Sequence, residues 1–356
     1  MRHRDRTGRR VREIIALIPA HNEEHYIGRT LDILHRSSHR PDRTIVIADN
    51  CSDRTSEVAT AHGAEVLTTT GNTGRRAGAL NQALDHVMPG LHGDDLILAM
   101  DADIDADEFF IENALAHFHE RPHLGAVSAN NGVMPHGTLL ELMQSMEFER
   151  DRRYIGRKLG KVGCMFGGGT IFRVGALRTV HQAYGEYYTD DSQTEDWMLT
   201  YALKHQGFTL LKPQDCIVTT VPVSKWRLLF KQRERWGRGY VEAIARFRVT
   251  RYTFVPWFGQ AVWAFSLAVW SAWAILMLRL TAHGATLTLP LWVLAGMALM
   301  SLSRVITVKR MGARSMLVAC TLFPEMVYRW VILAATTVGV FKHLTGRATQ
   351  WDAVRG

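Results

Sequence analysis

The carboxy-terminal third of the sequence contains two long stretches without a charged side chain. Residues 255–278 are rich in Trp and Leu, and residues 280–303 are interrupted only by His283 and Gly284. A helix needs about 20 apolar residues to cross roughly 30 Å of hydrocarbon. Helices of soluble proteins carry a polar face, and these stretches show almost none. We therefore predict two membrane spans, near 255–279 and 285–303, joined by a short turn into a helical hairpin.

Basic residues on either side of this hairpin predict its orientation. They precede the first span and follow the second, whereas the connecting turn is nearly free of them. The residues are Arg246, Arg248, Arg251, Arg304, Lys309, Arg310 and Arg314. Because Lys and Arg accumulate on the cytoplasmic side of spans, we expect a multi-pass protein of the inner or plasma membrane with a cytoplasmic amino-terminal domain.

A third apolar segment, 315–341, carries Pro324, Glu325 and Arg329 near its middle. Proline breaks helices, and a charge at mid-bilayer costs a few kcal/mol. We predict an interfacial helix near 315–323. The following part, 325–341, is either a short third span or a re-entrant helix, and 342–356 is a basic tail expected in the cytoplasm.

The chain carries a net charge of +8 and begins with a basic tail at 1–10. Such charge attracts nucleic acid or an anionic membrane surface. Because the sequence has no recognisable nucleic-acid-binding motif, we expect the lipid bilayer as partner and no nucleic acid. The first residues lack the apolar core of a signal peptide. The four cysteines show neither metal-type spacing nor an obvious pairing, which suits a reducing cytosol.

Three apolar runs in the first hundred residues each end in polar side chains: "IIALIPAHNE", "RTIVIADN" and "DDLILAMDAD". Helix-like stretches at 24–36 and 52–62 separate them, and this alternation predicts a parallel sheet. Ligands of such sheets bind beyond the carboxyl ends of the strands. The polar residues at those ends are His21, Asn22, Glu23, Asp49, Asp101 and Asp103. Polar turns are also common there in α/β proteins, but their convergence favours a nucleotide site.

The stretch "DADIDAD" raises the alternative of a calcium-binding EF-hand. Its ligand positions would be Asp101, Asp103, Asp105, Asp107 and Glu112. However, Ala stands at the sixth position, where the loop requires Gly, and the loop follows a strand-like run instead of a helix. We therefore disfavour calcium, and we expect the third and fourth of these aspartates to be bystanders.

Four further segments fit either a ligand site or ordinary structure. "GNTGRRAGALNQALD" puts Arg75 and Arg76 before a helix, where phosphate binds well, although it is neither a Walker nor a Rossmann motif. "GCMFGGGTIFR" suits close approach of a ligand to backbone, or a tight turn. "TEDW" places Glu195 and Asp196 at a helix start, where acids also complement the dipole. "KQRERWGRGY" is equally typical of a membrane-interface belt.

Taken together, "PAHNEE", "DNCSDRT", "RRAGALN", "DAD", "GGGTIFR", "TED" and "QRERW" give the chain a family resemblance over residues 14–236. It resembles the membrane-embedded family 2 glycosyltransferases, which include the cellulose, chitin and hyaluronan synthases and the bacterial poly-N-acetylglucosamine synthases. The resemblance implies an α/β fold with a GT-A catalytic domain at 11–222 and amphipathic interface helices with QxxRW at 223–254. A carboxy-terminal helical membrane region at 255–341 would follow.

The resemblance also implies roles for individual residues. The donor nucleotide would be bound by Pro19, His21, Glu23, Asp49, Arg76 and Asp101, with Asp49 on the base. Arg76 stands where the family usually has Lys, and the two side chains are not equivalent. Asp103 would hold Mg²⁺ or Mn²⁺, which prefer oxygen ligands, and Asp196 would be the general base. The diphosphate and the acceptor sugar would be held by Glu195, Gln232, Arg235 and Trp236.

The implied reaction is inverting, metal-dependent transfer of N-acetylglucosamine or a similar sugar from a UDP-sugar to a glycan hydroxyl. Two departures disfavour export of a long polymer by one chain: no spans precede the catalytic domain, and "RVITVKR" (304–310) resembles the active-site loop of cellulose synthases only weakly. Transfer of single sugars to a lipid or protein therefore stays open, as does a homo-oligomer. A different class of function is a non-catalytic, membrane-anchored scaffold that binds sugar nucleotides.

Overall fold

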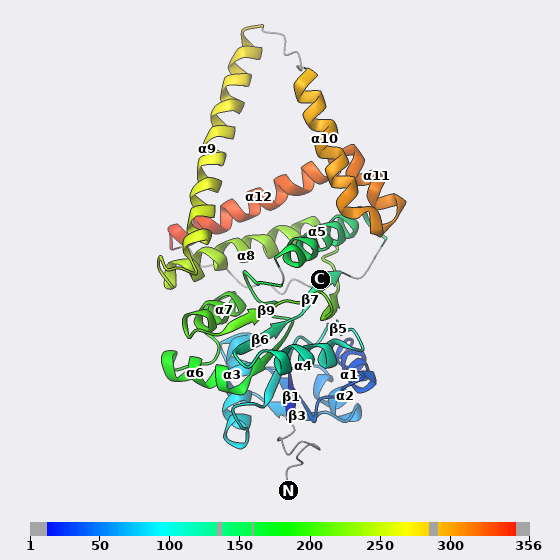
Figure 1. Ribbon diagram of the computed structural model, residues 1–356, viewed down its shortest axis with the longest axis vertical. Helices are drawn as coiled ribbons and strands as arrows, with labels where there is room; N and C mark the ends of the chain where they lie inside the picture. The colour runs from blue at the N-terminus through cyan, green and yellow to red at the C-terminus, as the bar shows by residue number, and fades with distance from the viewer. Residues whose placement is uncertain (1–12, 134–136, 159, 285–290, 347–356) are drawn as a thin grey trace.

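The computed structural model describes residues 13–133, 137–158, 160–284 and 291–346. Its strands are β1 (Ile14–Ala20), β2 (Arg43–Ala48), β3 (Glu65–Thr68), β4 (Leu96–Met100), β5 (Asp105–Ala106), β6 (Leu124–Ser128), β7 (Asn130–Val133), β8 (Gly169–Arg173), β9 (Thr209–Leu211) and β10 (Ile217–Thr220). An α/β layer forms one end of the molecule, and long helices rise from its other end (Figure 1).

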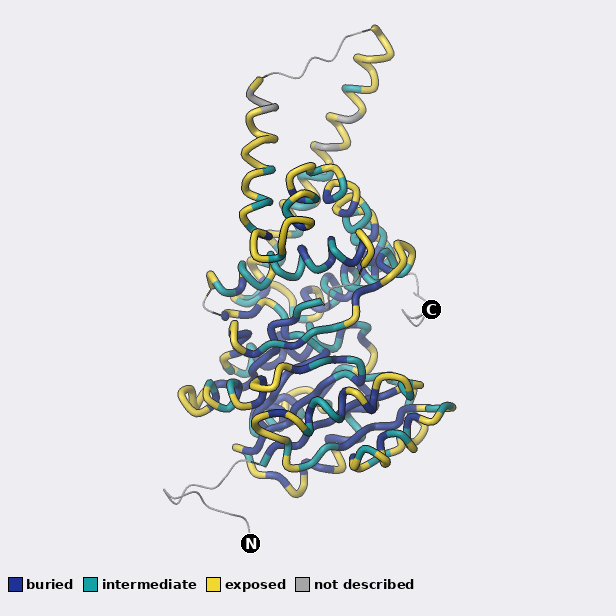
Figure 2. Tube along the Cα trace, turned by 90° about the vertical axis from the view of Figure 1, so that its right-hand side faces the viewer, coloured by how far each residue is buried: buried dark blue, intermediate teal, exposed yellow. Residues whose placement is uncertain are grey.

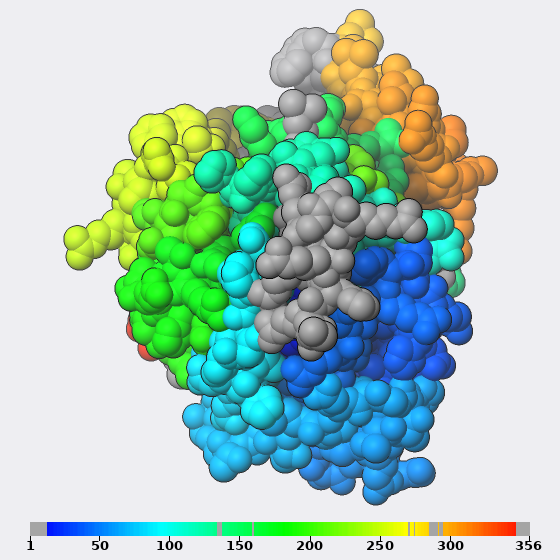
Figure 3. Space-filling view, turned by 60° about the horizontal axis from the view of Figure 1, so that its bottom comes forward, coloured from blue at the N-terminus to red at the C-terminus, as the bar shows by residue number. Residues whose placement is uncertain are grey.

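Helices cover the sheet and build the rest of the chain. They are α1 (Ile27–Arg36), α2 (Thr55–Ala61), α3 (Arg75–Val87), α4 (Phe110–Glu120), α5 (Leu139–Arg157), α6 (Val174–Tyr184), α7 (Glu195–His205), α8 (Trp226–Arg246), α9 (Phe254–Ala282), α10 (Leu291–Val308), α11 (Ala313–Thr321) and α12 (Phe323–Leu344). Short 3-10 turns occur at Met88–Gly90 and Lys309–Met311. Seen from the end away from α9, the surface consists mainly of the first two-thirds of the chain (Figure 3).

The main sheet has seven strands in the order β3-β2-β1-β4-β8-β6-β9. The first four are parallel, with Pro19 of β1 beside Ile47 of β2, as the apolar runs predicted. The sheet is mixed beyond these strands, because β8 is antiparallel to both of its neighbours. Gly169, the first residue of β8, pairs with Met100, the last residue of β4. The chain therefore enters β8 at the carboxyl end of β4 and runs in the opposite direction. A small second sheet has the order β5-β10-β7.

Apolar side chains on both faces of the main sheet form two separate cores. Alternate residues of β1 point to opposite faces: Ile15 and Leu17 join the core under α3, α6 and α7, and Ile14 and Ile18 join the core under α1, α2 and α4. Figure 2 shows this buried interior at the sheet end of the molecule. The sheet is therefore a rigid platform, and its carboxyl edge holds polar side chains in fixed positions.

The carboxy-terminal helices stand apart from this platform. Among the residues described, α9 is the one helix long and apolar enough to cross a bilayer, or one of two if α11 and α12 are counted as a single broken span. These two helices bend by 73° at Leu322, which has a left-handed φ of 59°. The second predicted span, near 285–303, lies partly outside the described residues, because 285–290 are not among them.

Contacts with α5 and α8 fix the helices that follow. α12 lies along α8 and roughly across the direction of α9 (Figure 1). Glu325, the acid expected to be costly in a membrane, is buried and paired with Arg150 of α5 and Arg304 of α10. Residues 304–310 end α10 and enter a 3-10 turn, and Arg153 of α5 donates to the Ile306 carbonyl, so this segment is not a loop over the sheet's carboxyl edge.

Candidate active site

The carboxyl edge of the parallel strands is shaped by two asparagines in left-handed conformation. Asn22 follows β1 with a φ of 57°, and Asn50 follows β2 with a φ of 50°. Asn tolerates this region better than most residues. The turns direct His21 to the next strand end, where its Nδ1–H donates to the Asp49 carbonyl at 2.7 Å. Nearby, the Glu23 backbone N–H donates to Thr55 Oγ1 at 2.8 Å.

Asp49 is buried at the end of β2, with 8% of its surface exposed. Its Oδ1 accepts three hydrogen bonds, from Thr69 Oγ1 at 2.8 Å, Asn72 Nδ2 at 2.8 Å and Asn50 Nδ2 at 3.0 Å. Three neutral donors on one oxygen hold the carboxylate in a single orientation. The side chain predicted to contact a base is therefore rigid before any ligand arrives.

Arg76 connects three predicted motifs. Its Nε donates to Asp101 Oδ1 at 2.7 Å, one terminal nitrogen donates to Glu195 Oε1 at 2.7 Å, and the other donates to the Gly167 carbonyl. The Asp101 backbone N–H also donates to the Gly168 carbonyl at 3.2 Å. The RRAGALN helix, the DAD turn, the glycine loop and the TED helix thus meet at one point.

Asp196 lies beside this junction. It lines a small cavity together with Arg76, Gly167 and Tyr188. Withdrawal from water and, next, the neighbouring Glu195 carboxylate raise the pKa of Asp196 to about 7. The Trp197 backbone N–H donates to its Oδ1 at 2.8 Å and partly opposes this shift. A carboxyl group with a pKa near neutrality can take up and release protons at working pH.

α8 brings the QxxRW segment over the same acids. Arg235 is half-buried, and its charge acts on Glu195, Asp196 and Asp101. Burial lowers its pKa, and these three carboxylates oppose that effect.

The other residues of the segment also lie on α8. Gln232 and Trp236 are half-buried, and the Arg233 guanidinium lies 4.1 Å from the centre of the Trp236 ring. Arg233 also donates to Glu147 of α5 at 2.6 Å.

The acidic turn after β4 separates its aspartates as expected. Asp103 is half-buried and lies two residues after Asp101, in the turn that follows β4. Asp105 lies in β5 and pairs with Arg29, and Asp107 Oδ1 accepts the Phe109 N–H at 3.0 Å at the start of α4. The turn is entered from a strand, and its last two aspartates have structural partners, so the EF-hand alternative is wrong.

The structure adds site residues that sequence reasoning missed. Asn72 and Thr69 hold Asp49, and Tyr188 lines the cavity beside Asp196. Asn81 of α3 holds the Tyr188 backbone through two hydrogen bonds, at 2.7 and 2.9 Å. A turn containing Asn and Gly gave the only sequence signal for Asn72, and no local signal marks Tyr188 in its long loop.

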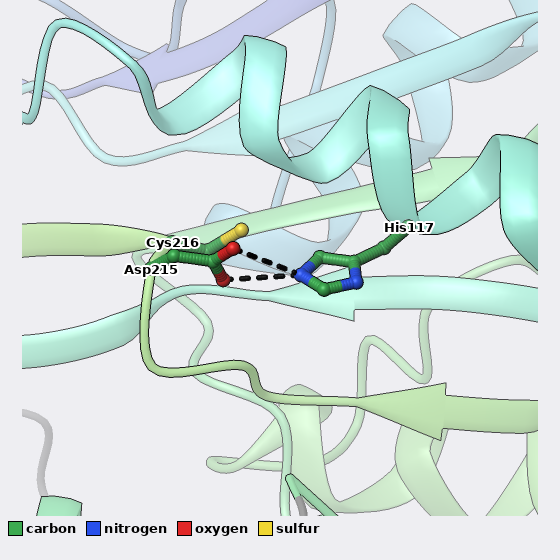
Figure 4. A group of neighbouring side chains, drawn as sticks. All are labelled: His117, Asp215 and Cys216. Atoms are coloured by element: carbon green, nitrogen blue, oxygen red, sulfur yellow. Dashed lines mark hydrogen bonds and ion pairs between the residues drawn. The ribbon is translucent and has the colours of Figure 1, made fainter.

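A second cluster of titratable side chains lies elsewhere. His117 of α4, with Asp215 and Cys216, is the one group in the described parts of the chain with three metal-type ligand atoms close together (Figure 4). His117 Nε2 lies 3.0 Å from Asp215 Oδ1, and Arg121 donates to its Nδ1 at 2.9 Å. Because Nδ1 accepts, the ring proton sits on Nε2 and points at Asp215. This arrangement is a hydrogen-bonded His–Asp pair, unlike a metal ligand, which donates through its second nitrogen.

Fold and site together define a glycosyltransferase of the GT-A type. The chain belongs to the family described as "Glycosyltransferase like family 2", whose model matches residues 12–239. Poly-beta-1,6-N-acetyl-D-glucosamine synthase of Staphylococcus aureus (strain COL) is 27% identical over 244 residues, which cover 65% of this chain and 56% of that protein. The same-named protein of Staphylococcus epidermidis is 25% identical over 244 residues, covering 66% and 56%. The chain thus spans about half the length of the curated relatives it matches.

A solved structure extends the likeness beyond the catalytic domain. A mannosyltransferase from Pyrobaculum calidifontis, in complex with GDP-Man and Mn²⁺, has a TM-score of 0.61 to this chain and 18% identity. The match covers 95% of this chain and 89% of that one. At this identity the match shows the fold alone, including the carboxy-terminal helical region.

Proposed function

We propose that this protein transfers a sugar from a UDP-sugar to an acceptor hydroxyl, with inversion and with Mg²⁺ or Mn²⁺, at the cytoplasmic face of a membrane. The acceptor is a growing β-linked glycan, and the sugar is N-acetylglucosamine or a close relative. The observation that carries the proposal is the meeting of four motifs around Arg76, with Asp196 beside them.

Asp196 is suited to be the general base. The acceptor oxygen attacks the anomeric carbon as its proton passes to the Asp196 carboxylate, and the bond from that carbon to the diphosphate breaks. Attack from the side opposite the leaving group inverts the anomeric centre. Positioned proton transfer of this kind contributes roughly 10²–10⁴ in rate. Glu195, held by Arg76, keeps the pKa of Asp196 raised towards the working pH.

The donor set beside β4 fits a divalent metal. Asp103, with Asp101 near it, offers carboxylate oxygens, and Mg²⁺ is commonly bound by one or two carboxylates plus substrate phosphates. When bound, the ion neutralises charge on the departing diphosphate. Arg235, whose charge reaches the same acids, would add a second positive group for that diphosphate. Gln232 and Trp236 would contact the acceptor sugar.

Membrane association rests on the exposed apolar surface of α9 and on the relatives. Large apolar residues along this helix are exposed, and soluble proteins rarely leave so large a patch exposed (Figure 2). They include Phe254, Val255, Phe258, Phe265, Trp273 and Leu278. The packing of α12 along α8 favours an in-plane or re-entrant helix over a third span.

Two other functions would use the same site. A single sugar could instead be transferred to a lipid or protein acceptor. A non-catalytic scaffold would bind donor without turnover. The raised pKa of Asp196 argues against the scaffold, because a binding protein has no need for a carboxyl poised near neutrality.

The test is a donor panel with the purified full chain in detergent and Mn²⁺. UDP- and GDP-sugars are supplied with and without oligosaccharide acceptors, and both released nucleoside diphosphate and product mass are measured. A ladder of products supports glycan extension, and a single mass increment supports single-sugar transfer. Asp196→Asn should abolish release while donor binding persists. Donor binding by the wild type without any release from any donor would establish the scaffold instead.

A further inference from the structure

Asn72 belongs to a motif that the proposed function has not yet used, the "GNTG" turn before α3. Its side chain makes contacts in three directions. Nδ2 donates to Asp49 Oδ1 and to the Arg75 carbonyl, both at 2.8 Å, and Oδ1 accepts the Gly74 N–H at 2.9 Å. The Asn72 carbonyl also accepts from Asn50 Nδ2 at 3.1 Å. One amide thus links the predicted base-contacting acid to the start of the helix that bears Arg76.

On one side, this amide lies directly against Gly78 of α3. A Cβ added to Gly78 would lie 2.1 Å from Asn72 Oδ1, so any larger residue there would push the amide aside. Arg75 adopts a left-handed φ of 54°, an unfavourable conformation that its hydrogen-bonded carbonyl helps to retain. Glycine at 78 and strain at 75 are both explained by the need to keep Asn72 in place.

The consequence for Asp49 is an asymmetric carboxylate. Oδ1 is occupied by three donors, whereas Oδ2 has no hydrogen-bond partner among the described residues. Asp49 keeps 8% of its surface exposed at the end of β2. A rigid, nearly buried side chain therefore presents a single acceptor oxygen to an incoming base.

We propose that Asn72 is a specificity-determining residue that makes the donor pocket prefer uracil over guanine, by leaving Asp49 only one oxygen to offer. Uracil presents one N–H between two carbonyls and is satisfied by one acceptor. Guanine presents two adjacent donors, N1–H and N2–H, and a carboxylate matches both only when both oxygens are available. This inference rests on the proposed function, since it assumes that Asp49 meets the donor base.

The experiment compares UDP and GDP binding to the full-length protein with Mn²⁺, by titration calorimetry. Wild type should bind UDP more tightly. Asn72→Leu keeps the approximate shape, frees Oδ1 of one donor and lets the carboxylate turn. The preference for UDP should then fall about ten-fold, since one hydrogen bond to a charged group is worth about that much in affinity. Gly78→Ala, which displaces the same amide from the other side, should lower the preference in the same way.

Gln82→Leu is the matched control. Gln82 also holds the loop before α3 through two amide hydrogen bonds, to the Thr70 N–H and carbonyl, but it does not contact Asp49. It should leave the ratio of UDP to GDP affinity within about two-fold of wild type.

Three outcomes overturn the proposal. They are equal loss of both nucleotides in Asn72→Leu and Gly78→Ala, an unchanged ratio in both variants, and a wild type that prefers GDP. The first two leave the proposed glycosyl transfer intact. Failure of the proposed function is distinct, because the wild type would then release no nucleoside diphosphate from any donor, whether or not it binds the nucleotides.

Discussion

The carboxyl group of Asp196 is withdrawn from water and lies next to Glu195, and these two causes raise its pKa to about 7. A general base works only when deprotonated, so lower pH removes the active form. We predict that kcat/KM, which reports the free enzyme, rises about ten-fold per pH unit below pH 7 and levels off above it. Initial rates in buffers from pH 5 to 9 measure this. A flat profile across pH 6–8, or an Asp196→Asn variant that keeps both the rate and its pH dependence, contradicts the assignment.

The three guanidinium nitrogens of Arg76 donate hydrogen bonds to three separate acceptors, Asp101, Glu195 and the Gly167 carbonyl. A lysine carries the same charge on one nitrogen and cannot span them. Although related enzymes are expected to have Lys here, we predict that Arg76→Lys lowers kcat/KM for the donor about ten- to hundred-fold in this chain. Steady-state kinetics with varied donor measure the loss. Arg178→Lys is the control, since Arg178 also donates to two backbone carbonyls but lies outside the site. Equal, small effects in both variants would mean that Arg76 has no special role.

Single residues were predictable where they end a regular element. Asp49, Asp101 and Asp196 follow or begin elements with a clear apolar pattern, and the structure brings Asp101 and Asp196 to one junction through Arg76. Asn72 was not predictable, because an Asn beside a Gly is typical of any turn. Its role depends on a hydrogen bond to Asp49, which lies 23 residues earlier in the sequence.

Helices α7 and α8 meet at a glycine. A Cβ added to Gly239 would lie 2.0 Å from Thr194 Oγ1, just before the TED acids, so this contact sets how closely Arg235 approaches them. We predict that Gly239→Ala moves α8 and lowers kcat about ten- to hundred-fold, since misplacement by about 1 Å can cost 10². Gly259→Ala in α9, where an added Cβ meets nothing within 4 Å, is the control. Thr194→Gly should partly restore the rate. Normal turnover by Gly239→Ala would show that the helix spacing is unimportant.

Element prediction succeeded where one pattern dominated and failed where pairing decided. β1 and β4 are continuous apolar runs, β2 ends in one, and α7 begins at its acids as expected. β7, "NNGV", has no apolar run and exists through its pairing with β10. The direction of β8 depends on the position of the glycine loop beside β4. The residues of β8 alone do not determine that position.

At the scale of the whole molecule, α12 presents two contrasting faces. One face is bound to the catalytic domain: Glu325 pairs with Arg150, Tyr328 donates to Glu147, and Lys342 pairs with Glu234 of α8. The other face is apolar and exposed along the length of the helix, at Phe323, Met326, Val327, Trp330, Phe341 and Leu344. A helix with a large apolar face on one side and protein on the other can lie in the plane of a membrane surface. α9 rises away from α12 in a different direction (Figure 1).

Spin labels on α12 and α9 distinguish an in-plane helix from a span. Met326 and Phe341 are 15 positions apart, about 22 Å along a helix. With α12 in the membrane plane, labels at these two sites should differ in depth by less than about 5 Å, whereas a spanning helix would separate them by about 20 Å. Labels at Phe258 and Ile275 of α9, both exposed, are the control and should differ by about 20 Å or more. The measurement uses full-length protein in lipid vesicles, with the native cysteines replaced and oxygen and nickel accessibilities giving depth. A depth gradient along α12 like that along α9 would mean that α12 leaves α8 to cross the bilayer.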